Sequence, residues 1–121
     1  MLFEYTATIT TDASGAATVY LGGRIRGRVQ MIKYAPGTLD TGADLTITGE
    51  TSGVPILTKA NAGTSTVFYY PRAVGHKVAD GAASTLSEVE VWVLEERIKV
   101  VVAQGGNILT GAITIWVDEE Q

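Results

Sequence analysis

The chain has 121 residues, 45% of them hydrophobic, which suits one domain that buries roughly two-thirds of its unfolded surface. Nine basic and thirteen acidic residues leave a formal charge of −4, which argues against nonspecific binding to nucleic acid or anionic lipid. Because cysteine is absent, disulfides and thiolate metal sites are excluded. We therefore expect a single domain over residues 1–121, with neither nucleic acid nor a membrane as its partner.

The first predicted element is a strand at the N-terminus. Residues 3–10 alternate between apolar and polar side chains, a pattern typical of a half-buried strand. Residues 12–15 (Asp-Ala-Ser-Gly) predict a turn, since aspartate and glycine both favour turn conformations. Residues 18–21 are then expected to return as the partner of the first strand.

A long strand is predicted next, over residues 24–34, after the break at Gly22-Gly23. Its apolar side chains change phase near its end, where Ile32 joins the opposite face. Gly27 inside the strand predicts a bulge or a close approach of two backbones.

Shorter strands are predicted through the middle of the chain. Residues 45–47 and 54–58 each form one, and Pro55 indicates an edge position for the second because proline cannot donate a ladder hydrogen bond. Residues 64–70 form a strand rich in threonine and aromatic residues. Residues 71–87, rich in Ala, Gly and Ser, are predicted to be a long loop.

Residues 87–96 carry two conflicting signals. Ser87 followed three residues later by Glu90 is a capping-box pattern, which favours a helix. Alternation of valine with glutamate and tryptophan favours a strand, and the β-branched residues agree. We prefer the strand.

The C-terminal residues predict the centre of the fold. Residues 98–103 are apolar on both faces, which is expected of an interior strand. Residues 104–107 (Gln-Gly-Gly-Asn) predict a turn, and residues 113–117 a returning strand, so we expect a hairpin. With about seven to nine short strands in all, the expected fold is a single-domain antiparallel β-sandwich, jelly-roll-like.

The residues that catalysis requires are scarce. His76 is the only histidine, which excludes Cys–His catalysis and sites built from several histidines, and no Gly-x-Ser-x-Gly motif accompanies it. Glu95 and Glu96 are adjacent, so a strand would point them to opposite faces and prevent their acting as a glycosidase pair. We therefore expect no catalytic residue, no metal, no cofactor and no enzyme activity.

Two groups of residues are interface candidates. Arg24, Arg26 and Arg28 occupy alternate strand positions about 6.6 Å apart, and we call them the arginine ladder. The ladder is either a solvated face or an electrostatic contact surface. We expect the ladder to meet acidic groups. These are either Glu88 and Glu90, which share its spacing, of the same or a neighbouring copy, or carboxylates on the surface of a partner.

The second group ends the strand at residues 64–70. Tyr69, Tyr70 and Arg72 flank a proline there. They are either core residues at the end of a strand or an anchor for a partner, because Tyr and Arg concentrate at interfaces.

Several stretches carry a resemblance that spans nearly the whole chain. They are Tyr5–Thr10 with the turn Asp12–Gly15, Pro36-Gly37 before Asp40–Asp44, Tyr69–Arg72, and Arg97–Val100 through Gly105-Gly106. In these features the chain resembles small structural proteins of tailed bacteriophage virions. The resemblance implies synthesis in a host cytoplasm, a place in the virion, and the major capsid protein or another virion protein as partner. It transfers no catalytic residue, and residues 1–5 show no signal-peptide pattern.

These observations lead to three functional hypotheses. The first is a capsid decoration (cement) protein that binds and stabilises the assembled head shell as a homo-oligomer, with a trimer favoured. The second is a head–tail connector or tail accessory protein. The third is a carbohydrate-binding β-module with a stacking platform of aromatic rings, drawn from Tyr69, Tyr70, Trp92 and Trp116.

Overall fold

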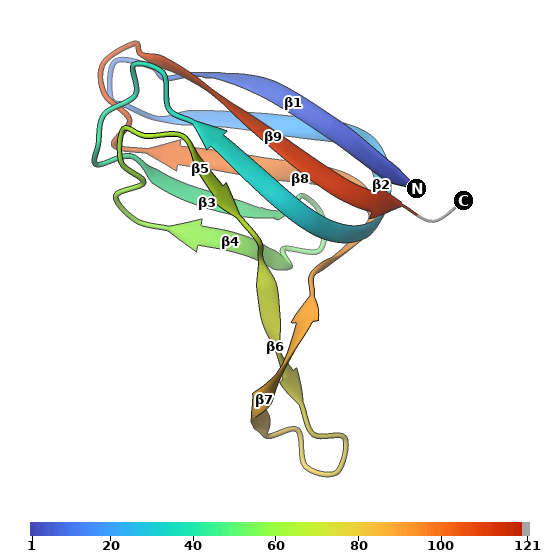
Figure 1. The fold of residues 1–121 in the computed structure, drawn as a ribbon. Coiled ribbons are helices and arrows are strands. Elements are labelled where there is room, and N and C mark those ends of the chain that lie inside the picture. Colours follow the sequence, from blue (N-terminus) through green and yellow to red (C-terminus); the bar gives the residue numbers. More distant parts are fainter. Residues whose placement is uncertain (120–121) are drawn as a thin grey trace.

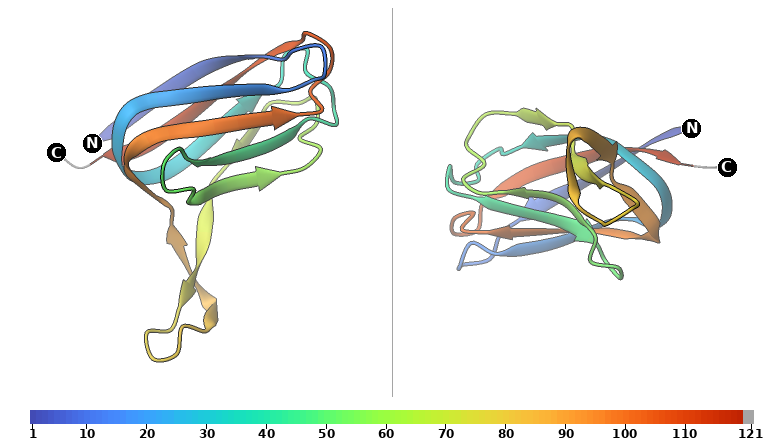
Figure 2. Two further views of the ribbon diagram at one scale, coloured as in Figure 1. Left: turned by 180° about the vertical axis from the view of Figure 1, so that it is seen from behind. Right: turned by 90° about the horizontal axis from the view of Figure 1, so that it is seen from below.

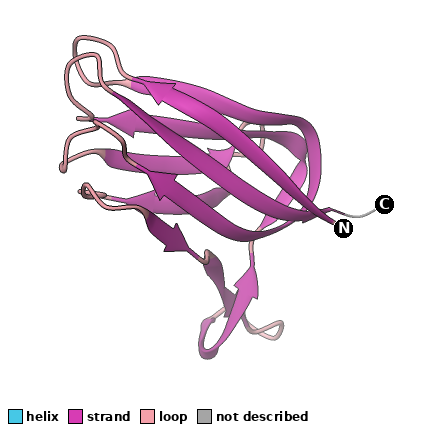
Figure 3. Cartoon of the chain, turned by 45° about the horizontal axis from the view of Figure 1, so that its top comes forward, coloured by secondary structure: helices cyan, strands magenta, loops and turns pink. Residues whose placement is uncertain are grey.

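The computed structural model describes residues 1–119, which form nine strands (Figure 1). Figure 3 shows only strands and loops in this part of the chain, so no helix within residues 1–119 could cross a membrane. The strands are β1 (Leu2–Thr10), β2 (Ala17–Ala35), β3 (Asp44–Gly49), β4 (Pro55–Lys59), β5 (Val67–Tyr69), β6 (Arg72–His76), β7 (Ala83–Glu90), β8 (Trp92–Ala103) and β9 (Thr110–Glu119).

Seven strands form one antiparallel sheet that folds over on itself. Its order is β1-β9-β2-β8-β3-β4, with β5 added beside the second half of β2. The first half of β2 pairs with β8 and the second half with β9, and β2 curves from one layer into the other (Figure 1). The prediction of an antiparallel β-sandwich is therefore confirmed.

Strand β2 differs from its prediction in length and in regularity. The expected break at Gly22-Gly23 does not occur, and one strand of 19 residues runs through it. Its ladder with β9 skips one residue, Gln30, between Val29 and Met31, which is a β-bulge. The bulge explains the change of phase in the sequence, because it turns Ile32 toward the same core as Val29.

The two predicted hairpins are wrong in their pairing. Strands β8 and β9 follow one another in the chain, yet β2 lies between them in the sheet. Likewise β1 pairs with β9, while residues 18–21 pair with β8. In both cases the connecting loop carries the chain from one layer to the other. The strands thus meet through side chains across the core, not through backbone hydrogen bonds.

The core lies between the two layers. Strand β8 is interior, as predicted, with β2 on one side and β3 on the other. However, only one of its faces is fully buried: Val100 and Val102 face the core, whereas Val101 is half-buried and Ala103 exposed. Other buried side chains come from every strand of the main sheet except β5, among them Ile9, Ile25, Tyr34, Leu45, Ile56, Ile113 and Ile115.

Strands β6 and β7 form a hairpin, residues 72–90, that we call the arm. It extends away from the sandwich in Figure 1 and in the left view of Figure 2, and within the described residues its two strands pair only with each other. The predicted loop over residues 71–87 is therefore wrong, since the loop proper is confined to residues 77–82. Residues 87–96 form strand, as we preferred, and the helix alternative is wrong, but they belong to two strands, β7 and β8, that are separated at Val91.

Candidate interaction surface

Exposed large apolar side chains concentrate in and around the arm. Eight of the thirteen on the described chain lie between residues 68 and 94, although this segment is less than a quarter of the protein. This clustering makes the segment the candidate interaction surface of the protein. The eight residues are Phe68, Tyr70, Val74, Val78, Leu86, Val89, Trp92 and Leu94.

A groove lies at the root of the arm, between edge strand β4 and the start of β8. It has a volume of about 470 Å³, and most of its lining is apolar, including Ile56, Leu57, Val91 and Leu94. We call it the root groove. A second hollow, on the side of Arg28, shares Glu90 and Trp92 with it.

A β-bulge in β8 sets the directions in which the side chains beside the root groove point. Glu95 has a positive φ of 60° and is the extra residue opposite the step from Ile25 to Arg26. On its N-terminal side Leu94 faces outward into the groove, and on its C-terminal side Glu96 turns inward. Glu95 is exposed and Glu96 buried, so the expectation that they point apart is met.

Carboxylates of the same chain meet two of the three residues of the arginine ladder. Arg24 pairs with Glu95 at 3.0 Å between Nη2 and Oε1. Arg28 pairs with Asp118 at 3.0 Å and with Glu90 at 3.5 Å. Arg26 makes no ion pair with any residue in the described range 1–119.

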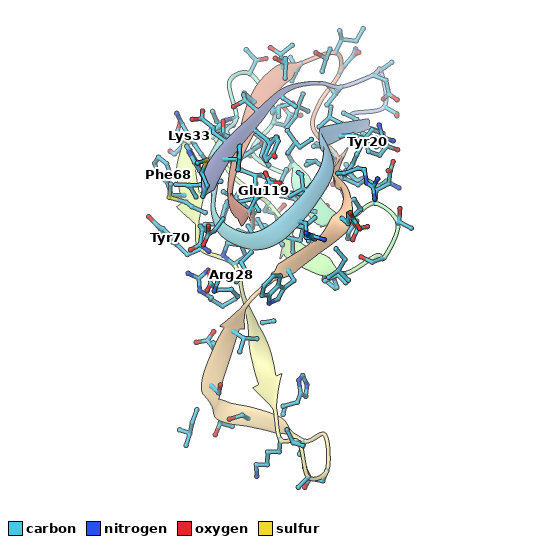
Figure 4. All side chains as sticks on the ribbon, turned by 90° about the vertical axis from the view of Figure 1, so that its right-hand side faces the viewer. Tyr20, Arg28, Lys33, Phe68, Tyr70 and Glu119 are labelled. Atoms are coloured by element: carbon cyan, nitrogen blue, oxygen red, sulfur yellow. The ribbon has the colours of Figure 1, made fainter. Side chains whose placement is uncertain are left out.

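Of the two expected partners of the arginine ladder, Glu90 pairs with it and Glu88 does not. Glu90 meets Arg28 and also accepts a hydrogen bond from Gln30, which ties the arm to β2. Glu88 lies farther along the arm, opposite Val74. The guanidinium of Arg28, which is labelled in Figure 4, also lies over the ring of Trp92, 5.6 Å from its centroid. Arg28 therefore contacts both Glu90, at the end of β7, and Trp92, at the start of β8.

We expect Arg28→Ala to lower the free energy of unfolding by about 1 kcal/mol, because its ion pairs are partly exposed and screened. The matched control Arg26→Ala, on the same face of β2, should change it by less than about 0.5 kcal/mol. Thermal unfolding of both variants beside the unmodified protein checks this. Equal losses would show that the contacts of Arg28 do not stabilise the arm root.

The second group of interface candidates, Tyr69, Tyr70 and Arg72, contains one core residue and two exposed ones. Tyr69 packs against the core, and burial raises its pKa. Tyr70 is 63% exposed and lies with Phe68 near Lys33 in Figure 4. Arg72 is exposed and donates to the carbonyl oxygen of Pro71 at 2.7 Å. Tyr69 is thus a core residue at the end of a strand, while Tyr70 and Arg72 are available to a partner.

The remaining candidates for chemistry lie apart. His76 is exposed on β6, opposite Ala83, and the described residues hold no cluster of His, Asp and Glu suited to a metal ion. Of the remaining rings proposed for sugar stacking, Trp92 lines the root groove and Trp116 is partly buried on β9.

Comparison with known proteins adds no family. No protein-family model matches the chain, and no curated protein sequence is significantly similar to it.

Proposed function

We propose that this protein is a non-enzymatic structural component of a bacteriophage particle, in the first instance a decoration protein that binds and stabilises the assembled head shell. The observation that carries the proposal is the arm, which extends from the sandwich and exposes apolar side chains. The resemblance of the sequence to small virion proteins supports the same class.

The arm suits assembly for a physical reason. A two-stranded hairpin is marginally stable by itself in water, and this one packs little of its length against its own sandwich. Its exposed apolar side chains gain burial only when another surface covers them. On a particle with many equivalent sites, several such contacts made together hold more strongly than any one alone.

Substitution on the arm tests the proposal. Particles that lack the protein are mixed with purified Val78→Asp/Leu86→Asp, and bound protein is measured after sedimentation. We expect occupancy to fall at least about tenfold, because two apolar anchors become charged. Ile108→Asp, at an exposed position in the loop between β8 and β9, is the control and should bind normally.

The same experiment separates the candidate functions. Binding to heads supports decoration, whereas binding only at the neck or tail, seen by electron microscopy of labelled particles, supports the connector or tail accessory. Normal occupancy by the arm variant, with its fold intact, would contradict a role of the arm in either.

A further inference from the structure

We infer that the arm of one copy docks into the root groove of a second copy of the same chain. The inference deepens the proposed function and rests on it, since it names the partner of the arm. Four features of the chain lead to it: the reach of the arm, the shape of the groove, unmatched charges, and the size of the surface offered.

The arm cannot fill its own groove. Leu86 lies four residues from Glu90 at the root, a separation of about 13 Å along the strand. Val78 lies farther out, in the turn. Both are almost fully exposed, at 96% and 104%, and the arm points away from the sandwich (Figure 2). The apolar end of the arm and the groove therefore need two different copies to meet.

The groove suits an extended strand. Residues 54–58 line it consecutively, and consecutive strand residues point to opposite faces, so the groove follows the edge of β4. Within residues 1–119, strand β4 pairs with β3 alone, and no strand lies along its other edge. An incoming strand would thus gain backbone hydrogen bonds there as well as the apolar contacts of Ile56 and Leu94.

One pair of opposite charges can meet when an arm docks into a neighbouring groove. Arg72 at the groove and Asp80 in the turn of the arm each lack an ion-pair partner within the described part of the chain. They are of opposite sign: Arg72 lines the groove at the base of the arm, whereas Asp80 lies in the turn, beside Lys77, which also makes no ion pair with a described residue. Docking of an arm tip into a neighbouring groove brings them into the same region.

The surface is large enough for a specific interface. The arm contributes 19 residues, from Arg72 to Glu90, and the root groove adds eight that lie outside the arm. When two copies exchange arms, each offers both surfaces, 27 residues in all, within the range of about 20–30 that one side of a standard interface uses. In a ring such as the expected trimer, each interface joins the arm of one copy to the groove of the next, so its two sides offer 19 and 11 residues.

Cysteine cross-linking tests the docking directly, because the native chain has no cysteine. Leu86→Cys and Leu57→Cys are made separately, mixed under mild oxidation at concentrations up to the solubility limit, and separated without reductant. We expect a disulfide-linked pair that contains one chain of each variant. The control mixture, Leu86→Cys with Ile108→Cys, should cross-link at least about tenfold less. Equal yields, or no pair from the first mixture, would overturn the inference.

A charge exchange provides a second, independent readout. Arg72→Asp and Asp80→Arg should each weaken self-association by up to about fivefold, measured by analytical ultracentrifugation. A mixture of the two variants should recover it in part, since one arm then matches the other groove. Both variants change exposed residues, and their thermal unfolding is checked first. Weakening without recovery would contradict the assigned pairing.

The inference and the proposed function fail in different ways. Particle binding without the cross-link would keep the structural role and place the arm on the shell instead. The cross-link without any particle binding would keep the arm–groove contact and contradict the role in a virion.

Discussion

Gly27→Ala is expected to lower the free energy of unfolding by about 3 kcal/mol. A Cβ atom at this position would lie 2.2 Å from the carbonyl oxygen of Asp118 and 2.8 Å from the Cα of Glu119. Both are backbone atoms of β9, so no side chain can rotate away and the strands themselves must separate.

The damage should reach both layers because of where Gly27 lies. It pairs with Val93 of β8 on one side and with Glu119 of β9 on the other, at the crossing of β2 from layer to layer. Urea unfolding followed by tryptophan fluorescence measures the effect. Trp92 and Trp116 lie on the two strands concerned.

Gly23→Ala is the matched control on the same strand. A Cβ atom there meets nothing within 4 Å, and the residue has no positive φ. We expect a change within about 0.5 kcal/mol. If both variants unfold at the same urea concentration, then β9 can shift away from Gly27 without cost and the close approach is not needed for stability.

Glu96→Gln is expected to lower the free energy of unfolding by about 2–3 kcal/mol. The carboxylate is 6% exposed and accepts hydrogen bonds from the amides of Thr51 and Ser52, at 2.7 and 2.8 Å, and from the Ser52 hydroxyl at 2.6 Å. An amide in its place turns an NH₂ group toward these donors. Glu95→Gln, in the adjacent exposed ion pair, is the control and should cost less than about 1 kcal/mol.

The same carboxylate makes stability depend on pH. Burial is the largest single influence and disfavours its charge, but the hydrogen bonds from Ser52 and Thr51 together outweigh it and leave the pKa of Glu96 lowered. A lowered folded-state pKa means that the stabilisation is complete above the ordinary value of 4.5 and is lost as pH falls below it.

Thermal unfolding from pH 7 downward should therefore show a steeper acid loss for the native chain than for Glu96→Gln. The loss is reduced in the variant but not abolished, because ion pairs and hydrogen bonds also lower the pKa values of Asp118 and Glu50. Parallel profiles for the two proteins below pH 4.5 would contradict the role of Glu96.

The sequence by itself determined where most strands lie. Alternation of apolar and polar residues depends only on the two-residue period of a strand, which is local, so residues 3–10 and 113–117 could be assigned without any partner. The backbone properties of single residues, such as proline and glycine, could likewise be interpreted without knowledge of the fold. Pro55 indicated an edge strand and Gly27 a close backbone approach, and the structure confirms both.

Only the tertiary structure decided which strands pair. The alternation of residues along a strand shows which side chains share a face, but it does not show which other strand pairs with it. The turn at residues 104–107 therefore predicted a hairpin over residues 98–117. In the structure, the chain instead crosses at this turn from one layer to the other. The bulges at Gln30 and Glu95 could not be predicted from the sequence, because each depends on the register with a partner strand.

The candidate surface shows the same division. Spacing along the chain suggested Glu88 and Glu90 as partners of the arginine ladder. Asp118, which pairs with Arg28, is 90 residues away in the chain, and only the pairing of β9 with β2 brings it near. The arm was not predicted from the sequence, because residues 71–87 are rich in Ala, Gly and Ser and suggested a loop. Its exposed apolar side chains became informative only once the fold showed that the sandwich does not cover them.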